Sequence, residues 1–291
     1  MINMDGIVSV YKEKGYTSHD VVAKARKILG QKRIGHTGTL DPDAEGVLPL
    51  CIGRATKVVP YLTDANKCYE AEVILGAYTT TEDATGEVVE TFNVCVTPKQ
   101  IEEVVSSFVG EYTQTPPMYS AIKINGVRLY ELARQGLVVD RPSRVVTIYN
   151  CEIIEPLVNN KFKIRVECSK GTYIRTLCTD IGKTLGCGAH MGHLLRTRVG
   201  KYTLENSFSL EDIIRGDWEL TCIESVFENF AQVVVKDYAN SLLYNGNQIS
   251  ADDVLVVPSS GEMVRMYDSS NKFIGIYKRV GSKFVVEKMF L

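Results

Sequence analysis

Several familiar signals are missing from this chain of 291 residues. No apolar run approaches the roughly 20 residues that a transmembrane helix needs, and the start, MINMDGIVSVYKEKG, lacks the charged and then apolar pattern of a signal peptide. No CxxC occurs among the 8 cysteines, several of which fall inside apolar runs, so we interpret them as reduced, buried thiols. We therefore expect a globular cytoplasmic protein without membrane association, disulfides or a bound metal.

The chain also lacks the strong positive charge that is typical of nucleic-acid-binding proteins, since its formal net charge is -2. The charge is unevenly distributed, however. Residues 161–201 carry nine Lys and Arg residues against two acidic ones, a local charge of +7, whereas residues 202–237 carry two against eight, a local charge of -6. A charged run is most often a solvated face, so the basic segment indicates a binding surface only if other features converge on it.

Four segments carry helix signals, and no internal repeat or low-complexity segment interrupts them. Three begin with a capping box, in which a Ser or Thr precedes an acidic or amide residue by three positions. These boxes predict helices after Thr17, Thr97 and Ser209, of which the first ends at Gly30. A further helix is predicted over residues 172–185, where apolar residues recur at helical spacing.

Strand-like alternation appears over residues 69–78 and 162–168. From about Val233 onward the chain changes to short strands joined by polar turns, as in a small barrel. Their predicted ranges are 263–267, 273–278 and 284–290. The acidic segment that ends near Glu228 is therefore a candidate domain boundary, and the whole pattern predicts a mixed α/β domain followed by a small β domain.

One aspartate stands out in the segment GHTGTLDPDAEGVLPLCIGRATK, residues 35–57. Asp41 lies in a loop rich in Gly, Thr and Pro that runs into the apolar stretch 47–52. Pro42 restricts Asp41 to an extended backbone, so a stiff loop can present the carboxylate in a fixed direction. The alternative interpretation is an ordinary Asp-Pro turn. The neighbouring carboxylates of Asp43 and Glu45 are expected to be solvated.

The histidines give weaker signals. His36 could stack, donate a hydrogen bond or merely satisfy the polar groups of its loop. His190 and His193 lie three apart on a segment that could be helical, but neither HExxH nor a third ligand accompanies them. A metal site is therefore not expected there.

The segment around Asp41 resembles the signature of the TruB-type tRNA pseudouridine synthases, which isomerise uridine 55 in the T loop of tRNA. Further matches follow in the order of the family. They are Lys67-Cys68-Tyr69 (the family's Lys-x-Tyr), PPMYSAIKINGVRLYELARQG (residues 116–136), SKGTYIRTLCTDIG (169–182), AHMGHLLRTRVG (189–200), and the pattern GEMVRMYD…FIGIYKR of an RNA-binding PUA domain. One departure is Glu13, which stands where the family has proline in Lys-Pro-x-Gly. Lys12 and Gly15 are retained, so the departure relaxes one turn without touching the matched catalytic positions.

The resemblance implies roles for individual residues. Asp41 is expected to be the essential carboxylate, Tyr69 the ring that stacks on the flipped uracil, and Arg175 the partner of Asp41. For Arg175 the alternative is a phosphate contact. Residues expected to bind substrate are His36, Gly38, Thr39, Lys12, Lys67, Lys170, Leu194 and Arg196. No cofactor is implied. Three routes stay open for an ionised Asp41: attack on C1′, attack on the pyrimidine ring, or removal of a ribose proton.

The resemblance also implies an α+β pseudouridine-synthase fold with a central, mainly antiparallel mixed sheet. A catalytic domain is expected at residues 1–228, with an insertion at about 95–150 that grips the T arm. A small PUA-like β-barrel for RNA binding is expected at 229–291. The expected partner is the T arm of tRNA, bound by a monomer that has no obligatory protein partner. The basic segment 161–201 would then face phosphates.

Two other classes of protein fit part of the pattern. A non-catalytic RNA-binding or RNA-folding protein could keep the fold, although the presence of Asp41, Tyr69 and Arg175 argues against it. A guide-RNA-dependent relative of the dyskerin type would work inside a ribonucleoprotein, but this chain retains the T-arm insertion. Activity on bare tRNA separates these alternatives.

Overall fold

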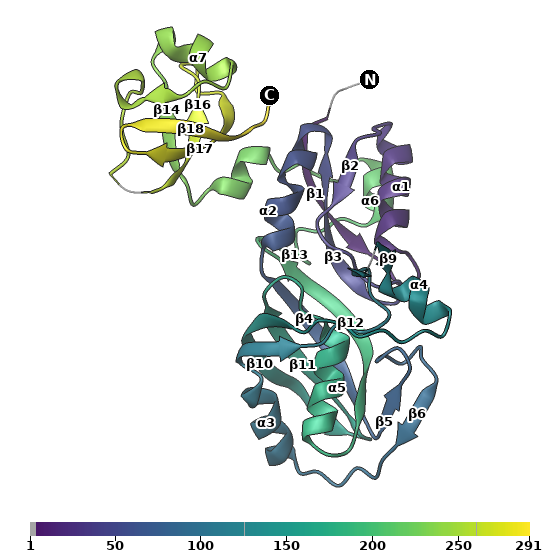
Figure 1. Cartoon of the computed structure of the whole chain (residues 1–291). Coiled ribbons are helices and arrows are strands. Elements are labelled where there is room, and N and C mark those ends of the chain that lie inside the picture. The colour runs from purple at the N-terminus through teal and green to yellow at the C-terminus, as the bar shows by residue number, and fades with distance from the viewer. Residues whose placement is uncertain (1–3, 125, 260) are drawn as a thin grey trace.

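The structure, a computed structural model, describes residues 4–124, 126–259 and 261–291. Within these residues nine strands form a central sheet, in which the main path runs β1-β3-β12-β4-β11-β10-β7, with β2 on β3 and β13 on β12 (Figure 1). The strands are β1 (Gly6–Lys12), β2 (Ile34–His36), β3 (Glu45–Ile52), β4 (Lys67–Leu75), β7 (Gly110–Gln114), β10 (Arg144–Val158), β11 (Lys161–Cys168), β12 (Ala189–Val199) and β13 (Tyr202–Thr203). The pairs are antiparallel except that of β3 with β12. The predicted mixed, mainly antiparallel sheet is therefore confirmed.

The parallel contact between β3 and β12 depends on a glycine. Gly46 pairs with Arg196 and has a φ of +110°, and a Cβ at this position would lie 2.2 Å from the carbonyl oxygen of Arg196. No side chain fits into so close an approach of two backbones. Because Gly46 allows the approach, residues 37–44, which immediately precede β3, lie next to the middle of the sheet.

The helices begin where the sequence predicts. Capping boxes at Thr17, Thr97 and Ser209 open three of them, and Gly30 in the left-handed conformation ends the first. The predicted helix at 172–185 is present as α5. The helices are α1 (Ser18–Leu29), α2 (Val59–Asp64), α3 (Pro98–Ser107), α4 (Leu129–Arg134), α5 (Ile174–Thr184), α6 (Leu210–Arg215) and α7 (Asn240–Tyr244), and the 3-10 helices are η1 (Gly53–Val58), η2 (Ile223–Phe227), η3 (Asp237–Ala239) and η4 (Ala251–Asp253). Among the described residues, no helix has the length and apolar composition to cross a membrane.

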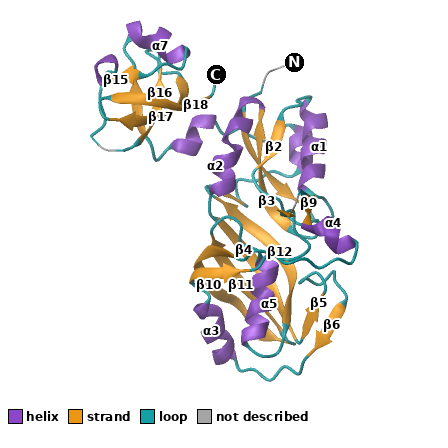
Figure 2. Ribbon diagram, in the orientation of Figure 1, coloured by secondary structure: helices purple, strands orange, loops and turns teal. Residues whose placement is uncertain are grey.

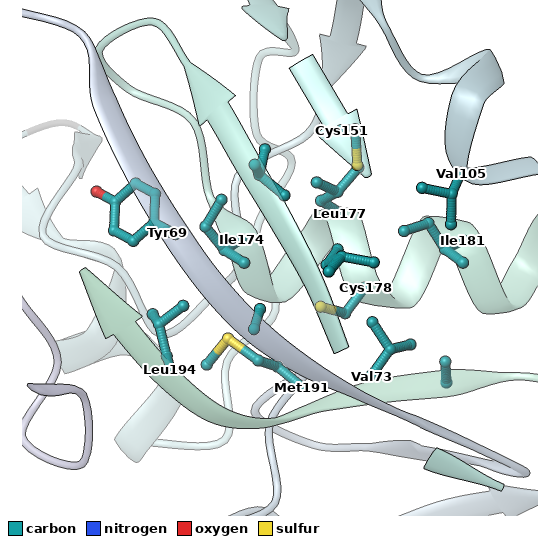
Figure 3. Packing of buried hydrophobic residues seen from close by; sticks show 14 of the residues in the cluster. Tyr69, Val73, Val105, Cys151, Ile174, Leu177, Cys178, Ile181, Met191 and Leu194 are labelled. Carbon is teal, nitrogen blue, oxygen red and sulfur yellow. The ribbon is translucent and has the colours of Figure 1, made fainter. Parts of the chain in front are cut away.

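Two cores lie on the two halves of the central sheet. Helices α3 and α5 cover strands β4, β10, β11 and β12, and the buried residues between them form one cluster (Figures 2 and 3). Helix α1 covers β1, β2 and β3 and packs beside α6 (Figure 1). The apolar stretch 47–52 is the interior of β3, and its side chains are fully buried, as the sequence predicts.

A third core belongs to the C-terminal sheet, which has the strand order β14-β16-β17-β18-β15 and curls into a half-barrel. The three strands predicted from the sequence are β16, β17 and β18. The strands are β14 (Ala231–Val234), β15 (Ile249–Ser250), β16 (Met263–Tyr267), β17 (Phe273–Val280) and β18 (Lys283–Met289). Two small hairpins lie outside both sheets: β5 (Ala77–Thr79) with β6 (Val88–Thr91), and β8 (Lys123–Ile124) with β9 (Val127–Arg128).

The helical placement of His190 and His193 is wrong, because both lie on strand β12. His190 Nδ1 is 3.0 Å from the carbonyl oxygen of Ala77, and His193 Nε2 is 2.7 Å from Glu45 Oε2. A bulge between Met191 and Leu194 breaks the alternation of the strand, which is why the sequence resembles a helix here. The two imidazoles bind different partners and do not form a ligand pair.

Candidate active site

Asp41 lies in the loop between β2 and β3, residues 37–44, which we call the Asp41 loop. Buried side chains of Leu40 and Ala44 anchor the loop to the core on either side of Asp41. Ser18 Oγ accepts from the Leu40 N–H at 2.9 Å and also donates to the Leu40 carbonyl at 3.3 Å. The N–H of Gly15 donates to the Pro42 carbonyl at 2.9 Å. The backbone on both sides of Asp41 is therefore fixed, and its carboxylate points out of the loop with 42% of the side chain exposed.

Arg175 meets the Asp41 carboxylate from the first turn of α5. Its Nε lies 3.0 Å from Asp41 Oδ2, and its Nη2 lies 3.5 Å from Oδ1, so the two groups face each other side by side. The guanidinium is almost fully buried, with 6% of the side chain exposed. It also donates to the carbonyls of Thr81 at 3.1 Å and Tyr119 at 2.8 Å, and Asp83 Oδ2 lies 3.9 Å from Nη1. Arg175 thus joins three loops around one carboxylate.

The surroundings of Asp41 oppose and support its charge at once. Burial raises the pKa of the Asp41 carboxyl above its ordinary value, and the nearby carboxylate of Asp83 acts in the same direction. The guanidinium of Arg175 and the ammonium of Lys12 lower that pKa, but by less. The ionised form of Asp41 therefore depends on Arg175. A carboxylate whose pKa is raised in this way is a stronger base once ionised than a free carboxylate is.

Tyr69 lies on β4 at the edge of the core that also contains Leu40, Ile174 and Leu194. Its side chain is 8% exposed, and Figure 3 shows the ring beside Ile174 with the hydroxyl directed away from Leu177. Burial raises the pKa of the Tyr69 phenol, so the ring is neutral. A flat, neutral ring close to the Asp41 loop is suited to stacking on a base.

Three predicted substrate ligands are buried, and two of them, Lys12 and Arg196, hold carbonyls of the Asp41 loop. Lys12 is fully buried, and its ammonium donates to the carbonyls of Glu13, Tyr16 and Pro42. Arg196 is 1% exposed and donates to the carbonyls of Val47 at 2.8 Å and Gly38 at 3.2 Å.

Lys67 completes this buried group, since its ammonium donates to the carbonyls of Thr63 and Ala65. Burial lowers the pKa of Lys12 and that of Lys67 to about 8 in each case. Carbonyls occupy all three N–H donors of Lys12, two of the three of Lys67 and two of the five of Arg196. Their burial shows that they support the site, and their direct contact with substrate stays a prediction.

The remaining predicted ligands lie at the rim of the site or in its wall. His36 is half-buried, with its ring edge-on to His19 at 5.2 Å, and Gly38 donates to its Nδ1 at 3.4 Å. Burial and the neighbouring His19 lower the pKa of His36, which favours the neutral imidazole. Thr39 is exposed, and Leu194 is buried in the core next to Tyr69.

Lys170 lies on the surface, where it pairs with Asp64 at 2.8 Å. The same holds for most of the basic segment 161–201, which the sequence predicts as a phosphate-facing surface. Seven of its nine cations pair with carboxylates, four of them from distant segments, as in Arg165 with Glu70 at 2.9 Å. The ion-paired residues are Lys161, Lys163, Arg165, Lys170, Arg175, Arg198 and Lys201. Exposed ion pairs of this kind are weak, so they do not exclude phosphate contacts, and the phosphate-facing role of the segment stays a prediction.

Sequence reasoning missed several residues that complete the site. Ser18 fixes the backbone of Leu40, and Asp83 and Tyr119 contact Arg175 from two other loops. Glu45 is also more than a solvated carboxylate, because His193 and Tyr11 both contact it, the latter at 3.3 Å. The hydrogen bond with His193 lowers the pKa of Glu45. Asp43 is exposed, as predicted. Tyr119 lies in the matched segment 116–136, which could have drawn attention to it.

The fold and the Asp–Arg pair together define a class of enzyme. Solved structures with the same fold include a Cbf5-Nop10-Gar1 complex, with a TM-score of 0.74 and 29% identity over 98% of this chain and 85% of the other. A second is an H/ACA RNP bound to a substrate RNA containing 2′-deoxyuridine, with a TM-score of 0.73 and 27% identity over 98% and 85%. These neighbours place the chain among the pseudouridine synthases.

Family comparisons identify the branch of that class. Residues 26–174 match the TruB family pseudouridylate synthase N-terminal domain, and residues 175–228 match the tRNA pseudouridylate synthase B C-terminal domain. The tRNA pseudouridine synthase B of Lachnoclostridium phytofermentans is 48% identical, over 99% of this chain and all of the relative. That of Bacillus cereus is 44% identical, over 94% and 92%. The chain belongs to the TruB family of pseudouridine synthases.

Proposed function

We propose that this enzyme isomerises uridine 55 in the T loop of tRNA to pseudouridine, with Asp41 as the essential carboxylate. The observation that carries the proposal is the contact of Arg175 with Asp41, made by Nε at 3.0 Å and Nη2 at 3.5 Å, at the mouth of a fixed loop. The tRNA substrate follows from the relatives, which are named tRNA pseudouridine synthase B.

The reaction breaks the bond from C1′ to N1, rotates the uracil and joins C1′ to C5, with loss of the C5 proton and gain of a proton at N1. Each of the three routes open to Asp41 needs the ionised carboxylate, which Arg175 stabilises. The uracil must first leave its stack, which costs a few kcal/mol. Stacking on Tyr69 contributes about 1 to 3 kcal/mol toward that cost. The reaction needs no cofactor, because no net oxidation or group exchange occurs.

RNA recognition is proposed for surfaces on either side of Asp41. In the insertion, Lys123, Arg128 and Arg134 are exposed, and the last two lie over the ring of Tyr130. These cations and the rim residues His36, Gly38 and Thr39 are suited to a splayed loop and its phosphates. Residues 229–291, with their curled sheet, are proposed as a PUA-like RNA-binding domain attached to a catalytic domain of residues 1–228. We further propose that the enzyme acts as a cytoplasmic monomer.

The deciding experiment measures tritium release from an unmodified tRNA transcript that carries 5-tritiated uridine, because joining C5 to C1′ expels the C5 hydrogen. We expect one equivalent of tritium per tRNA from wild type and none from Asp41→Asn, which should still bind tRNA. Replacement of uridine 55 by cytidine in the transcript should abolish release and serves as the matched substrate control.

Other outcomes point to other functions. The solved neighbours are parts of complexes, one of them bound to a substrate RNA, which keeps a guide-dependent enzyme as the second candidate. Tight binding of the bare transcript without tritium release would favour that candidate or a non-catalytic RNA-binding protein. Release from the variant Asp41→Asn at the wild-type rate would reject Asp41 as the catalyst.

A further inference from the structure

Gln114 is a fully buried polar residue at the end of β7, the strand that leads into the insertion. Its side-chain oxygen accepts from the N–H of Tyr173 at 2.7 Å, and its side-chain nitrogen donates to the carbonyl of the same residue at 2.9 Å. A third contact, at 3.5 Å, runs from that nitrogen to the hydroxyl of Tyr112. The side-chain amide of Gln114 thus bonds to both the N–H and the carbonyl of Tyr173, as the backbone of a neighbouring β-strand would.

Tyr173 is the residue that opens α5. It is the N-cap of this helix, and no side chain of its own caps the helix. The first N–H groups of a helix have no partner within it, so the position of the first turn depends on outside contacts. Gln114 supplies such a contact two residues before Arg175, the residue that pairs with Asp41.

The insertion reaches Arg175 a second time. Five residues after Gln114, the carbonyl of Tyr119 accepts from Arg175 Nη2 at 2.8 Å, and the same nitrogen lies 3.5 Å from Asp41 Oδ1. The buried pair Pro116 and Pro117 lies between the two contact points and stiffens the connection. A movement of the insertion must therefore act on the main chain of Tyr173 and on the guanidinium of Arg175.

We propose that Gln114 is a positioning residue that couples residues 115–143, the part of the insertion that follows β7, to the Arg175–Asp41 pair. The proposal rests on the proposed function of Asp41. When RNA engages the insertion, Gln114 holds the start of α5 in place, so that Arg175 stays aligned with the carboxylate. The two main-chain bonds to Tyr173 carry this effect, and Gln114 itself touches neither the substrate nor Asp41.

The test compares Gln114→Met with Tyr112→Phe. Methionine keeps the length of the side chain but loses both bonds to Tyr173. Tyr112 lies on the same strand, and its hydroxyl bonds to Asp180, near the far end of α5. Tyr112→Phe therefore removes a tether between β7 and α5 while both bonds between Gln114 and Tyr173 stay in place. Single-turnover rates, tRNA affinity, melting temperature and pH profiles are measured on both full-length variants and wild type.

For Gln114→Met we expect a single-turnover rate about 10- to 100-fold below wild type, with tRNA affinity unchanged. The acidic limb of its pH–rate profile should move to higher pH, because a displaced Arg175 stabilises the ionised Asp41 less. Tyr112→Phe should lower the melting temperature without either change. If Gln114→Met does not fold, Gln114→Glu, which keeps the oxygen that accepts from Tyr173, should show the same shift to a smaller degree.

The inference fails if a folded Gln114 variant has the rate and acidic limb of Tyr112→Phe while wild type is active. It also fails if the single-turnover rate of the variant falls only by the factor by which its affinity for tRNA falls. An inactive wild type would instead reject the proposed function, so the two failures are distinguishable.

Discussion

At the scale of single residues, the site separates the carboxylate from most of the cations that support it. Lys12 and Arg196 hold carbonyls of the Asp41 loop, and only Arg175 directly contacts the carboxylate of Asp41 among the described residues. The cations of Lys12 and Arg196 bond to neutral carbonyls of the loop and not to the carboxylate itself, and Lys12 lowers the pKa of Asp41 less than Arg175 does. Arg175 therefore supplies most of the charge compensation at Asp41. One guanidinium does not outweigh the effect of burial, so the pKa of Asp41 is raised.

This arrangement predicts the pH dependence of Arg175 variants. The proposed role of Asp41 requires its ionised form, so activity should be present above its pKa and be lost as the pH falls through that value. Burial already raises this pKa, and Arg175 holds it down. Arg175→Gln removes the charge, so we expect the acidic limb to move to higher pH and the rate at the optimum to fall about 100-fold or more. Arg175→Lys keeps a charge but not the two-point contact, and should shift the limb less.

Single-turnover rates between pH 5 and pH 9 measure this effect. Arg165→Gln is the matched control, because Arg165 forms ion pairs at the surface with Glu70 and Glu152 and with neither Asp41 nor Asp83. Its profile should equal that of wild type. An unchanged acidic limb in Arg175→Gln would mean that the ionisation of Asp41 does not limit the reaction.

The individual site residues were predictable to different degrees. The resemblance identifies Asp41 and Arg175, whose pairing the structure bears out by distance. The burial of Lys12, Lys67 and Arg196 could not be predicted, because a buried lysine and an exposed one look alike in sequence. Their acceptors are backbone carbonyls, which leave no pattern in the side chains. Asp83 was missed for a related reason, since its hairpin loop meets α5 only in the folded chain.

At the scale of elements, the local signals were the reliable ones. The capping boxes at Thr17, Thr97 and Ser209 are present as predicted, since their bonds join residues three apart. Strand β12 was mistaken for a helix because its bulge breaks the alternation. The ion pairs of the basic segment could not be predicted, because most of its acidic partners lie on other elements, as with Glu70 on β4 and Glu228 after η2.

The insertion is the element whose behaviour should change on binding. Its hairpin β8–β9 has two exposed or half-exposed residues per strand, and an isolated short hairpin is marginally stable in water. Its fixed points are Gln114 and the fully buried Leu129. We expect fast amide exchange in the hairpin of the free enzyme and strong protection when tRNA binds.

Hydrogen exchange over residues 110–145 with and without unmodified tRNA measures this change. Helix α5 is the internal control, since its amides lie in a packed helix in both states and should exchange slowly throughout. Equal protection of 110–145 in the two states, at saturating tRNA, would contradict ordering of the insertion by RNA.

At the scale of the whole molecule, the C-terminal sheet is joined to the central sheet through aromatic side chains. Phe227, at the end of η2, contacts Tyr61 at 5.0 Å between ring centroids on one side. On the other side it contacts Phe290 at 5.6 Å, and Phe273 stacks beyond Phe290. Lys57 adds bonds from η1 to the carbonyls of Met289 and Leu291. One continuous cluster therefore joins the C-terminal sheet to β3, the strand that follows the Asp41 loop.

This connection predicts that Phe227→Ala uncouples the two parts of the molecule. Phe227 is 2% exposed, so its truncation should lower the free energy of unfolding by about 3 to 5 kcal/mol. Because the cluster around Phe227 joins the two sheets, calorimetry should resolve two unfolding transitions in the variant and one in wild type. Phe284→Ala is the control, since Phe284 is buried inside the C-terminal core alone. That variant should unfold its own sheet early without changing the contact of Tyr61 with Phe227.

The functional consequence follows from the same geometry. If residues 229–291 bind RNA at a fixed distance from Asp41, their loosening in Phe227→Ala should weaken tRNA binding, because the two contact surfaces no longer act as one rigid site. The single-turnover rate at saturating tRNA should stay near wild type, because no group that contacts Asp41 has changed. Wild-type affinity in a variant with two resolved transitions would show that a fixed C-terminal sheet is not needed for recognition.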